Sequence, residues 1–154
     1  THMPVFLTQP YIYIANNFDN FDCLVKNLPK FTYGLRMLFP FVSLTGLKFI
    51  MPNLVPATVY LTSTELTTLT MFYDAYYDFG VIGVFVFALL VGIVAKVVID
   101  IIKKSDNPVV YLLYGQIAVY LALAFFTTWF SGPATWFWLI LTGMIYYYVG
   151  YDKK

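Results

Sequence analysis

FGVIGVFVFALLVGIVAKVVIDII, residues 79–102, is the stretch of sequence that decides the fold. A helix over these residues is about 36 Å long, and the hydrocarbon core of a bilayer is about 30 Å thick. The stretch contains two charged residues, Lys96 and Asp100, whose i, i+4 spacing places them on one helix face, where they can pair. Both lie near Lys103 and Lys104, so their side chains can reach the membrane surface. The sequence therefore predicts a membrane-spanning helix over 79–102.

Two further apolar runs follow, over 108–130 and 134–149. The first begins at a proline, which suits the first turn of a helix, and its one strongly polar side chain is Gln116. A tight turn at Ser131-Gly132-Pro133 separates the two runs. Aromatic residues gather near both ends of the last run, as in the aromatic belts at membrane surfaces: Trp129, Trp136, Trp138, Tyr146, Tyr147, Tyr148 and Tyr151. We predict an all-α integral membrane protein in which three transmembrane helices follow an extracytoplasmic segment, residues 1–78.

The composition agrees with a membrane location and argues against several other classes. Of the 154 residues, 60% are hydrophobic and 11% are charged, which is roughly half the charged fraction of a soluble domain. The net charge of +1 includes no basic stripe that would bind nucleic acid. A single cysteine, Cys23, cannot form an internal disulfide, and no residue cluster has the spacing of a metal site. We therefore expect no metal, no cofactor and no nucleic-acid partner.

The lysines predict the orientation in the membrane. Lys103 and Lys104 follow the first span, and Lys153 and Lys154 follow the third, so three spans place both clusters on one side. The turn at 131–133 carries no positive charge. Because positively charged loops stay in the cytoplasm, we expect the C-terminus inside and residues 1–78 outside.

The predicted outer segment contains a second apolar stretch, Tyr33 to Met51. Pro40 and Gly46 interrupt it, and Arg36 and Lys48 leave too few residues between charges for a span. We therefore expect amphipathic or re-entrant helices at the outer membrane face.

Carboxylates, one arginine and several tyrosines make this outer segment the place where chemistry is expected. It contains no glycine-rich phosphate loop and no signature of a serine or zinc hydrolase. An arginine or lysine can hold a diphosphate, a carboxylate can accept a proton from a sugar hydroxyl, and tyrosines can stack on sugar rings. Taken one at a time, each acidic residue is better explained as a surface charge or a helix cap than as a catalytic group.

Three stretches resemble one known family, the bacterial oligosaccharide repeat-unit polymerases, or O-antigen polymerases. The stretches are Tyr13-Ile14-Ala15-Asn16-Asn17-Phe18-Asp19-Asn20, Tyr33-Gly34-Leu35-Arg36-Met37-Leu38-Phe39-Pro40 and Asp74-Ala75-Tyr76-Tyr77-Asp78-Phe79-Gly80-Val81-Ile82-Gly83. They are similar to outer-loop motifs of that family and to the start of one of its late transmembrane helices. The resemblance covers roughly residues 11–100 and implies the C-terminal portion of a larger enzyme.

The resemblance implies a metal-independent glycosyl transfer at the outer face of the bacterial cytoplasmic membrane. The expected substrate is an oligosaccharide linked to polyprenyl diphosphate, and the expected partners are the lipid bilayer and other membrane proteins of polysaccharide assembly. Arg36 is the residue expected to hold the diphosphate or glycan. Asp19 and Asp78 are expected to act as base or to bind sugar, and Asn17, Asp74 and Tyr77 are expected to bind substrate. Asp78 has an alternative role as a cap on the first span.

Two other functions stay open from the sequence. The chain is compatible with a non-catalytic membrane subunit or scaffold, in which case Arg36, Asp19 and Asp78 scatter over the surface. It is also compatible with a transporter fragment, which requires Lys96, Asp100 and Gln116 to face one cavity. The enzyme hypothesis requires Arg36, Asp19 and Asp78 to converge on one outward cleft.

Overall fold

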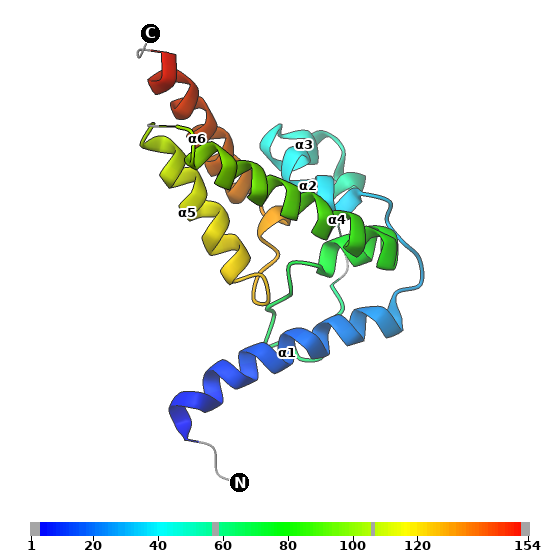
Figure 1. Ribbon diagram of the computed structural model, residues 1–154. Coiled ribbons are helices and arrows are strands. Elements are labelled where there is room, and N and C mark those ends of the chain that lie inside the picture. Colours follow the sequence, from blue (N-terminus) through cyan, green and yellow to red (C-terminus); the bar gives the residue numbers. More distant parts are fainter. Residues whose placement is uncertain (1–3, 57–58, 106, 152–154) are drawn as a thin grey trace.

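The computed structural model describes residues 4–56, 59–105 and 107–151, and the regular structure in these ranges is helical (Figure 1). The elements are α1 (Val5–Asn27), α2 (Leu35–Leu44), α3 (Leu47–Ile50), η1 (Pro52–Leu54), α4 (Tyr73–Ile102), α5 (Val109–Ala122), η2 (Trp129–Ser131) and α6 (Pro133–Tyr151). α5 contacts both α4 and α6, and α2 contacts the same two helices. α1 lies across the end of this helix group that is farthest from the end of α6 (Figure 1). The all-α prediction is confirmed for the described residues.

The decisive apolar stretch forms most of α4. This helix begins at Tyr73 rather than at Phe79, and its backbone leaves the helical conformation once, at Gly80. Beyond that break its apolar side chains face outward: Val81, Ile82 and Phe85 are 70–75% exposed. Within the described ranges, α4 is the one helix that is both long enough and apolar enough to cross a membrane.

The prediction of three spanning helices is corrected by the structure to one candidate span. The run 108–130 is helical in α5 only over 14 residues, about 21 Å, which is shorter than the bilayer core. After Ala122 the chain turns, because the rings of η2 fold inward: Phe130 packs on Phe87 at 5.8 Å and on Tyr120 at 5.9 Å between ring centroids. α6 covers the third run, but its many aromatic residues leave it less apolar than α4.

The described part of residues 1–78 contains more helix than its sequence pattern predicts. The stretch 33–51 forms two short helices, α2 and α3, which are separated by Gly46 at φ 74°. α1 was not expected, because its second half is polar. It continues through this half because Asn16 and Asn20 donate hydrogen bonds to the backbone of residues 66–68 and are buried there.

The predicted orientation in the membrane depends on polar residues at the end of the helix group where α4 ends. Lys96 and Asp100 pair at 3.1 Å between Nζ and Oδ2, which confirms the predicted i, i+4 contact. The loop after α4 lies beside the last turns of α6, because Asn107 Nδ2 donates to the Tyr146 carbonyl at 3.2 Å. Lys153 and Lys154, on which the predicted orientation also depends, lie outside the described residues.

Candidate functional site

The candidate site forms where the start of α2 meets the first turns of α4. The chain before α2 runs along α4: Thr32 N donates to the Tyr77 carbonyl at 3.3 Å, and Tyr33 N donates to the Asp78 carbonyl at 3.1 Å. Tyr33 and Gly34 then adopt positive φ angles of 51° and 98°, which turn the chain into α2. These contacts join two segments that lie more than 40 residues apart in the sequence.

Asp78 is fully buried and accepts three hydrogen bonds at the N-terminus of α2. Arg36 N donates to Oδ1 at 3.2 Å, Met37 N donates to Oδ2 at 2.8 Å, and the Thr32 hydroxyl also donates to Oδ1. The first N–H groups of a helix have no partner within the helix, and a carboxylate there also interacts favourably with the helix dipole. Asp78 therefore caps α2, although it belongs to α4.

Two glycines after Asp78 explain why the chain can make this arrangement. Gly80 has φ 64° and ψ −149°, a conformation that is essentially restricted to glycine. A Cβ atom on Gly80 would lie 2.8 Å from the ring of Phe31, and one on Gly83 would lie 2.3 Å from the Ala75 carbonyl oxygen. The stretch 78–83 thus forms a compact turn that separates the first turns of α4 from its apolar part.

Arg36 lies beside Asp78 and is held from two sides. Its Nε forms an ion pair with Asp74 Oδ1 at 2.6 Å, and the two side chains are 10% and 5% exposed. The guanidinium carbon lies 4.4 Å from the ring centroid of Tyr77 and 5.7 Å from that of Tyr73. Carboxylate pairing and stacking on aromatic faces both fix the guanidinium plane. Arg36 is therefore a preorganised cation in a nearly buried setting.

The structure brings four of the six predicted site residues together and leaves two on α1. Arg36, Asp74, Tyr77 and Asp78 form one cluster, which we call the Arg36 cluster. Asn17 is buried, its Nδ2 donates to the Tyr13 carbonyl at 2.6 Å, and its Oδ1 has no hydrogen-bond partner among the described residues. Asp19 lies on the exposed side of α1, so the convergence that the enzyme hypothesis requires is seen for Arg36 and Asp78 but not for Asp19.

Sequence reasoning missed Thr32 and Tyr33, which complete this region. Thr32 donates to the Asp78 carboxylate, and Tyr33 is 77% exposed at the edge of the cluster, where its ring meets Phe79 edge-on at 6.5 Å. The signal for them was the Thr-Tyr-Gly sequence immediately before a helix, a position where caps and turns are usual. Asn20 was also missed; its i, i+4 spacing from Asn16 places both amides on one face of α1.

An apolar cavity of about 410 Å³ begins directly beside the Arg36 cluster. Its lining includes Met37 and Ala75, which follow Arg36 and Asp74 in the chain, and it continues between α2, α4, α5 and α6 past Phe87. The lining is almost entirely hydrophobic. The four residues of the Arg36 cluster do not line the cavity themselves; Met37 and Ala75 lie between the two.

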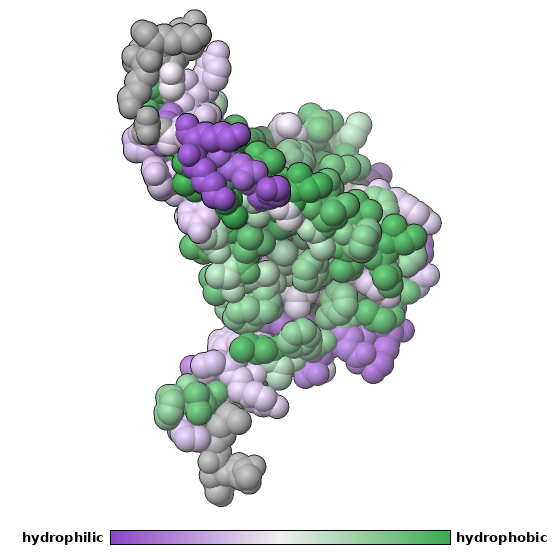
Figure 2. All heavy atoms as spheres, in the orientation of Figure 1, coloured by the Kyte–Doolittle hydropathy of each residue, from purple (hydrophilic) through white to green (hydrophobic). Residues whose placement is uncertain are grey.

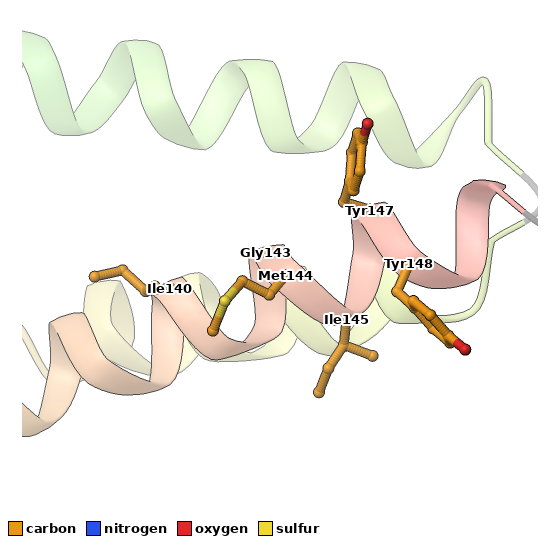
Figure 3. A pocket seen from close by; sticks show the side chains of 6 residues that line it. All are labelled: Ile140, Gly143, Met144, Ile145, Tyr147 and Tyr148. Atoms are coloured by element: carbon orange, nitrogen blue, oxygen red, sulfur yellow. The ribbon is translucent and has the colours of Figure 1, made fainter.

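A wider hollow of about 670 Å³ lies on α6, and Figure 3 shows the side chains around it. Tyr147 and Tyr148 leave the helix in different directions, and both are more than 70% exposed. The lining residues all belong to α6 and carry no charged group: Ile140, Gly143, Met144, Ile145, Tyr147 and Tyr148. We assign no chemistry to this surface.

The groups expected of a transporter do not face one cavity. Lys96 and Asp100 pair on the exposed side of α4, whereas Gln116 Nε2 donates to Thr142 Oγ1 at 3.0 Å between α5 and α6. Across the described ranges, no three His, Cys, Asp or Glu side chains are grouped so that they could hold a metal ion. No protein family, no curated protein and no solved structure matches the chain.

Proposed function

We propose that this chain is part of a membrane glycosyltransferase that polymerises oligosaccharide repeat units linked to polyprenyl diphosphate. The observation that carries the proposal is the meeting of Arg36, Asp74, Tyr77 and Asp78 beside an apolar cavity. A lipid-linked sugar diphosphate needs both a cation for its phosphates and an apolar surface for its chain. The Arg36 cluster supplies the cation, and the cavity, whose lining includes the neighbouring Met37 and Ala75, supplies the apolar surface.

In this proposal Arg36 binds the diphosphate or the adjoining sugar. Asp74 and Tyr77 hold its guanidinium group in one orientation, which reduces the entropy lost when a ligand binds. The acceptor hydroxyl oxygen forms a bond to the anomeric carbon of the donor. The bond from that carbon to the diphosphate oxygen breaks, and the diphosphate leaves with the electron pair. Negative charge grows on the leaving group, where a fixed cation stabilises it.

The two predicted catalytic carboxylates receive different roles. Asp78 has both carboxylate oxygens engaged in capping α2, so we assign it to positioning Arg36. Asp19 is exposed on α1, so it is the carboxylate that an acceptor sugar can reach. We propose Asp19 as the group that takes the hydroxyl proton.

The proposed location is the bacterial cytoplasmic membrane, with residues 1–78 outside. α4 crosses the bilayer from the Arg36 cluster to Lys103 and Lys104, and positive charge favours the cytoplasmic side. The α5–α6 hairpin packs beside α4, so the C-terminus returns to the cytoplasmic end. The lipid bilayer and other polysaccharide-assembly membrane proteins are the proposed partners.

A non-catalytic membrane subunit is the second candidate function. The specific observation that favours it is the mutual satisfaction of the Arg36 cluster: Arg36 pairs with Asp74, and Asp78 caps α2. Such a cluster also stabilises the contact between two helices without any catalytic role. The two functions differ in what Asp19 does, because a scaffold gives this exposed carboxylate no role.

The experiment introduces the substitution Asp19→Asn into the gene for this protein in the bacterium that makes it. Asp19 is exposed, so the substitution leaves folding and the amount of protein in the membrane unchanged. We expect surface glycans to shift from long chains to single repeat units, because loss of a general base slows transfer by about 10²-fold or more. Chain lengths are read by gel electrophoresis, and protein amount is read by immunoblotting of membranes.

The matched control is Asp22→Asn, which removes an exposed carboxylate from the same helix that pairs with Lys26. This variant should keep the normal chain-length distribution. Arg36→Lys supplies a second readout, because lysine keeps the charge but loses the planar fork. Normal chains from both Asp19→Asn and Arg36→Lys would reject the enzyme in favour of the subunit.

A further inference from the structure

α1 is anchored to the rest of the protein along one face. Asn16 and Asn20 both donate to the Leu66 carbonyl, at 2.9 and 3.0 Å. Closer to the C-terminus of α1, Leu24 is fully buried in a cluster with Tyr73 and Tyr77. These contacts fix the helix firmly against the loop 59–70 and the start of α4.

A second face of α1 is apolar and exposed. Its residues recur at intervals of three, four or seven, which places them in one narrow sector of the helix. Each is between 41% and 60% exposed, and together we call them the apolar stripe: Leu7, Tyr11, Ile14, Phe18 and Val25. At 100° per residue the stripe lies on the side of the helix, between the face that carries Leu24 and the face that carries Asp19 and Lys26.

A third face of α1 carries its charges. Asp19, Asp22 and Lys26 lie next to the apolar stripe on its side away from the anchored face, and we call them the charged flank. Lys26 Nζ and Asp22 Oδ2 pair at 2.6 Å in an exposed setting. In the second half of α1 the free surface is thus divided into an apolar stripe and a charged flank.

The position of α1 restricts what the apolar stripe can contact. Phe21 and Tyr76 meet edge-on at 5.3 Å, so the second half of α1 lies against the first turns of α4. These turns are the end of the candidate span opposite Lys103 and Lys104. In Figure 1, α1 runs across this end, transverse to α5. With α4 as the proposed membrane span, a helix fixed in this way lies at the level of the membrane surface rather than within the hydrocarbon.

We propose that α1 is an interfacial helix whose apolar stripe inserts into the outer leaflet of the bilayer while its charged flank faces water. This proposal rests on the membrane location proposed above. Amphipathic helices bind at this level by placing their apolar faces about 5–10 Å into the boundary between headgroups and acyl chains. Tyr11 and Phe18 are aromatic residues of the kind that favour this zone. Through α1, the membrane surface would set the height of Asp19 above the bilayer.

A lipid surface fits the apolar stripe better than a partner helix does. The 3–4 spacing also occurs in coiled coils, but a coiled-coil seam repeats over about three to four heptads. The apolar stripe covers residues 7–25 and ends before a third heptad is complete. Pro10 lies inside α1, where it removes one helical hydrogen bond and disturbs a regular seam.

The test uses spin labels on single cysteines in the full chain, reconstituted in phosphatidylcholine–phosphatidylglycerol vesicles. Cys23 is the one native cysteine, so Cys23→Ser gives a clean background. Labels are placed by Phe18→Cys on the apolar stripe, by Asp19→Cys on the charged flank and by Val86→Cys on exposed α4. Collisions with oxygen, which concentrates in lipid, are compared with collisions with a water-soluble nickel chelate.

We expect the Phe18→Cys label to collide severalfold more with oxygen than with nickel, and the neighbouring Asp19→Cys label to show the reverse. Equal nickel access at both positions, with the Val86→Cys label in lipid, would overturn the interfacial helix while leaving the membrane protein intact. Protection of Phe18→Cys from both reagents would also overturn it, and would indicate a protein partner or second copy. Nickel access at Val86→Cys would instead remove the membrane location itself.

Discussion

At the scale of single residues, Asp78 and Arg36 connect two elements through different chemistry. Asp78 satisfies two backbone N–H groups and a hydroxyl without exposing any of its own surface. Arg36, on α2, adds an ion pair with Asp74 and a contact with the ring of Tyr77. A nearly buried charge is tolerated when it is paired and hydrogen-bonded, and each of these residues meets that condition.

Replacing Asp78→Ala should destabilise the protein by about 2 kcal/mol or more, because buried N–H groups of α2 lose their acceptor. Thermal unfolding in detergent, followed by circular dichroism, measures the effect. Asp22→Ala is the control, since its pair with Lys26 is exposed and such surface pairs contribute little to stability. An unchanged unfolding temperature for Asp78→Ala would show that the cap is not needed, and would return Asp78 to the list of possible bases.

At the scale of elements, α4 and α5 show how single positions divide the chain. Gly80 separates seven residues that carry the Arg36 cluster from the long apolar part of α4, because its conformation is open to glycine alone. α5 stops at Ala122, after which Phe130 turns back to pack against Phe87 and Tyr120. Each break lets side chains contact a neighbouring helix. In a continuous helix the same side chains would point away from that neighbour.

Gly80→Ala should therefore destabilise the protein by about 2 kcal/mol or more, because alanine resists the glycine conformation and its Cβ meets Phe31. The matched control is Gly92→Ala in the same helix, where an added Cβ has nothing within 4 Å. That substitution should be neutral or stabilise by up to about 1 kcal/mol through helix propensity. Equal unfolding temperatures for the two variants would contradict the role of the break.

At the scale of the whole molecule, polarity is arranged in a band. Figure 2 shows hydrophobic side chains across the middle of this face, with hydrophilic patches over the C-terminal end of α4 and over the C-terminal half of α1. The exposed Lys96–Asp100 pair belongs to the first of these ends, and the exposed Lys26–Asp22 pair belongs to the second. This arrangement suits a protein whose middle is surrounded by lipid.

A charge placed in the middle of the band should oppose membrane insertion. Leu89 is 54% exposed near the centre of the apolar part of α4, and Leu89→Arg should cost about 2.5–3.5 kcal/mol of insertion free energy. The fraction of protein retained in membranes after an alkaline carbonate wash measures the effect. Thr64→Arg, which adds the same charge to an exposed loop position, should leave that fraction unchanged. Full retention of Leu89→Arg would mean that this face of α4 is not in contact with lipid.

The sequence predicted those features that depend on neighbours along the chain. The apolar run of α4 and the pairing of Lys96 with Asp100 follow from helical spacing alone. The length of α5 and the existence of α1 did not follow. Phe130 extends an apolar pattern in the sequence, yet in the structure its ring packs against Phe87 after α5 has ended. The polar half of α1 is stabilised by hydrogen bonds from its buried asparagines to a loop.

The candidate site shows the same division. Arg36 and Asp78 were predicted as site residues from their chemistry. The order of the motifs that contain them led to the expectation that they lie close together. Asp19 was expected to lie beside them. The structure does not bring it into this cluster, because its side chain lies on the exposed side of α1. Thr32 and Tyr33 were missed because the Thr-Tyr-Gly sequence indicates a turn before a helix but does not indicate that Thr32 binds a carboxylate from α4.

The long apolar helix predicted over residues 79–102 was determined by the sequence alone, since hydropathy and helical spacing are local properties of that stretch. The Arg36 cluster at its start was decided by the tertiary structure. Arg36 N and the Asp78 carboxylate come from positions 42 residues apart, and their contact requires the turn at Gly80 and the packing of α2 on α4. Hydrogen bonds between distant segments depend on how the whole chain folds, so no local pattern encodes them.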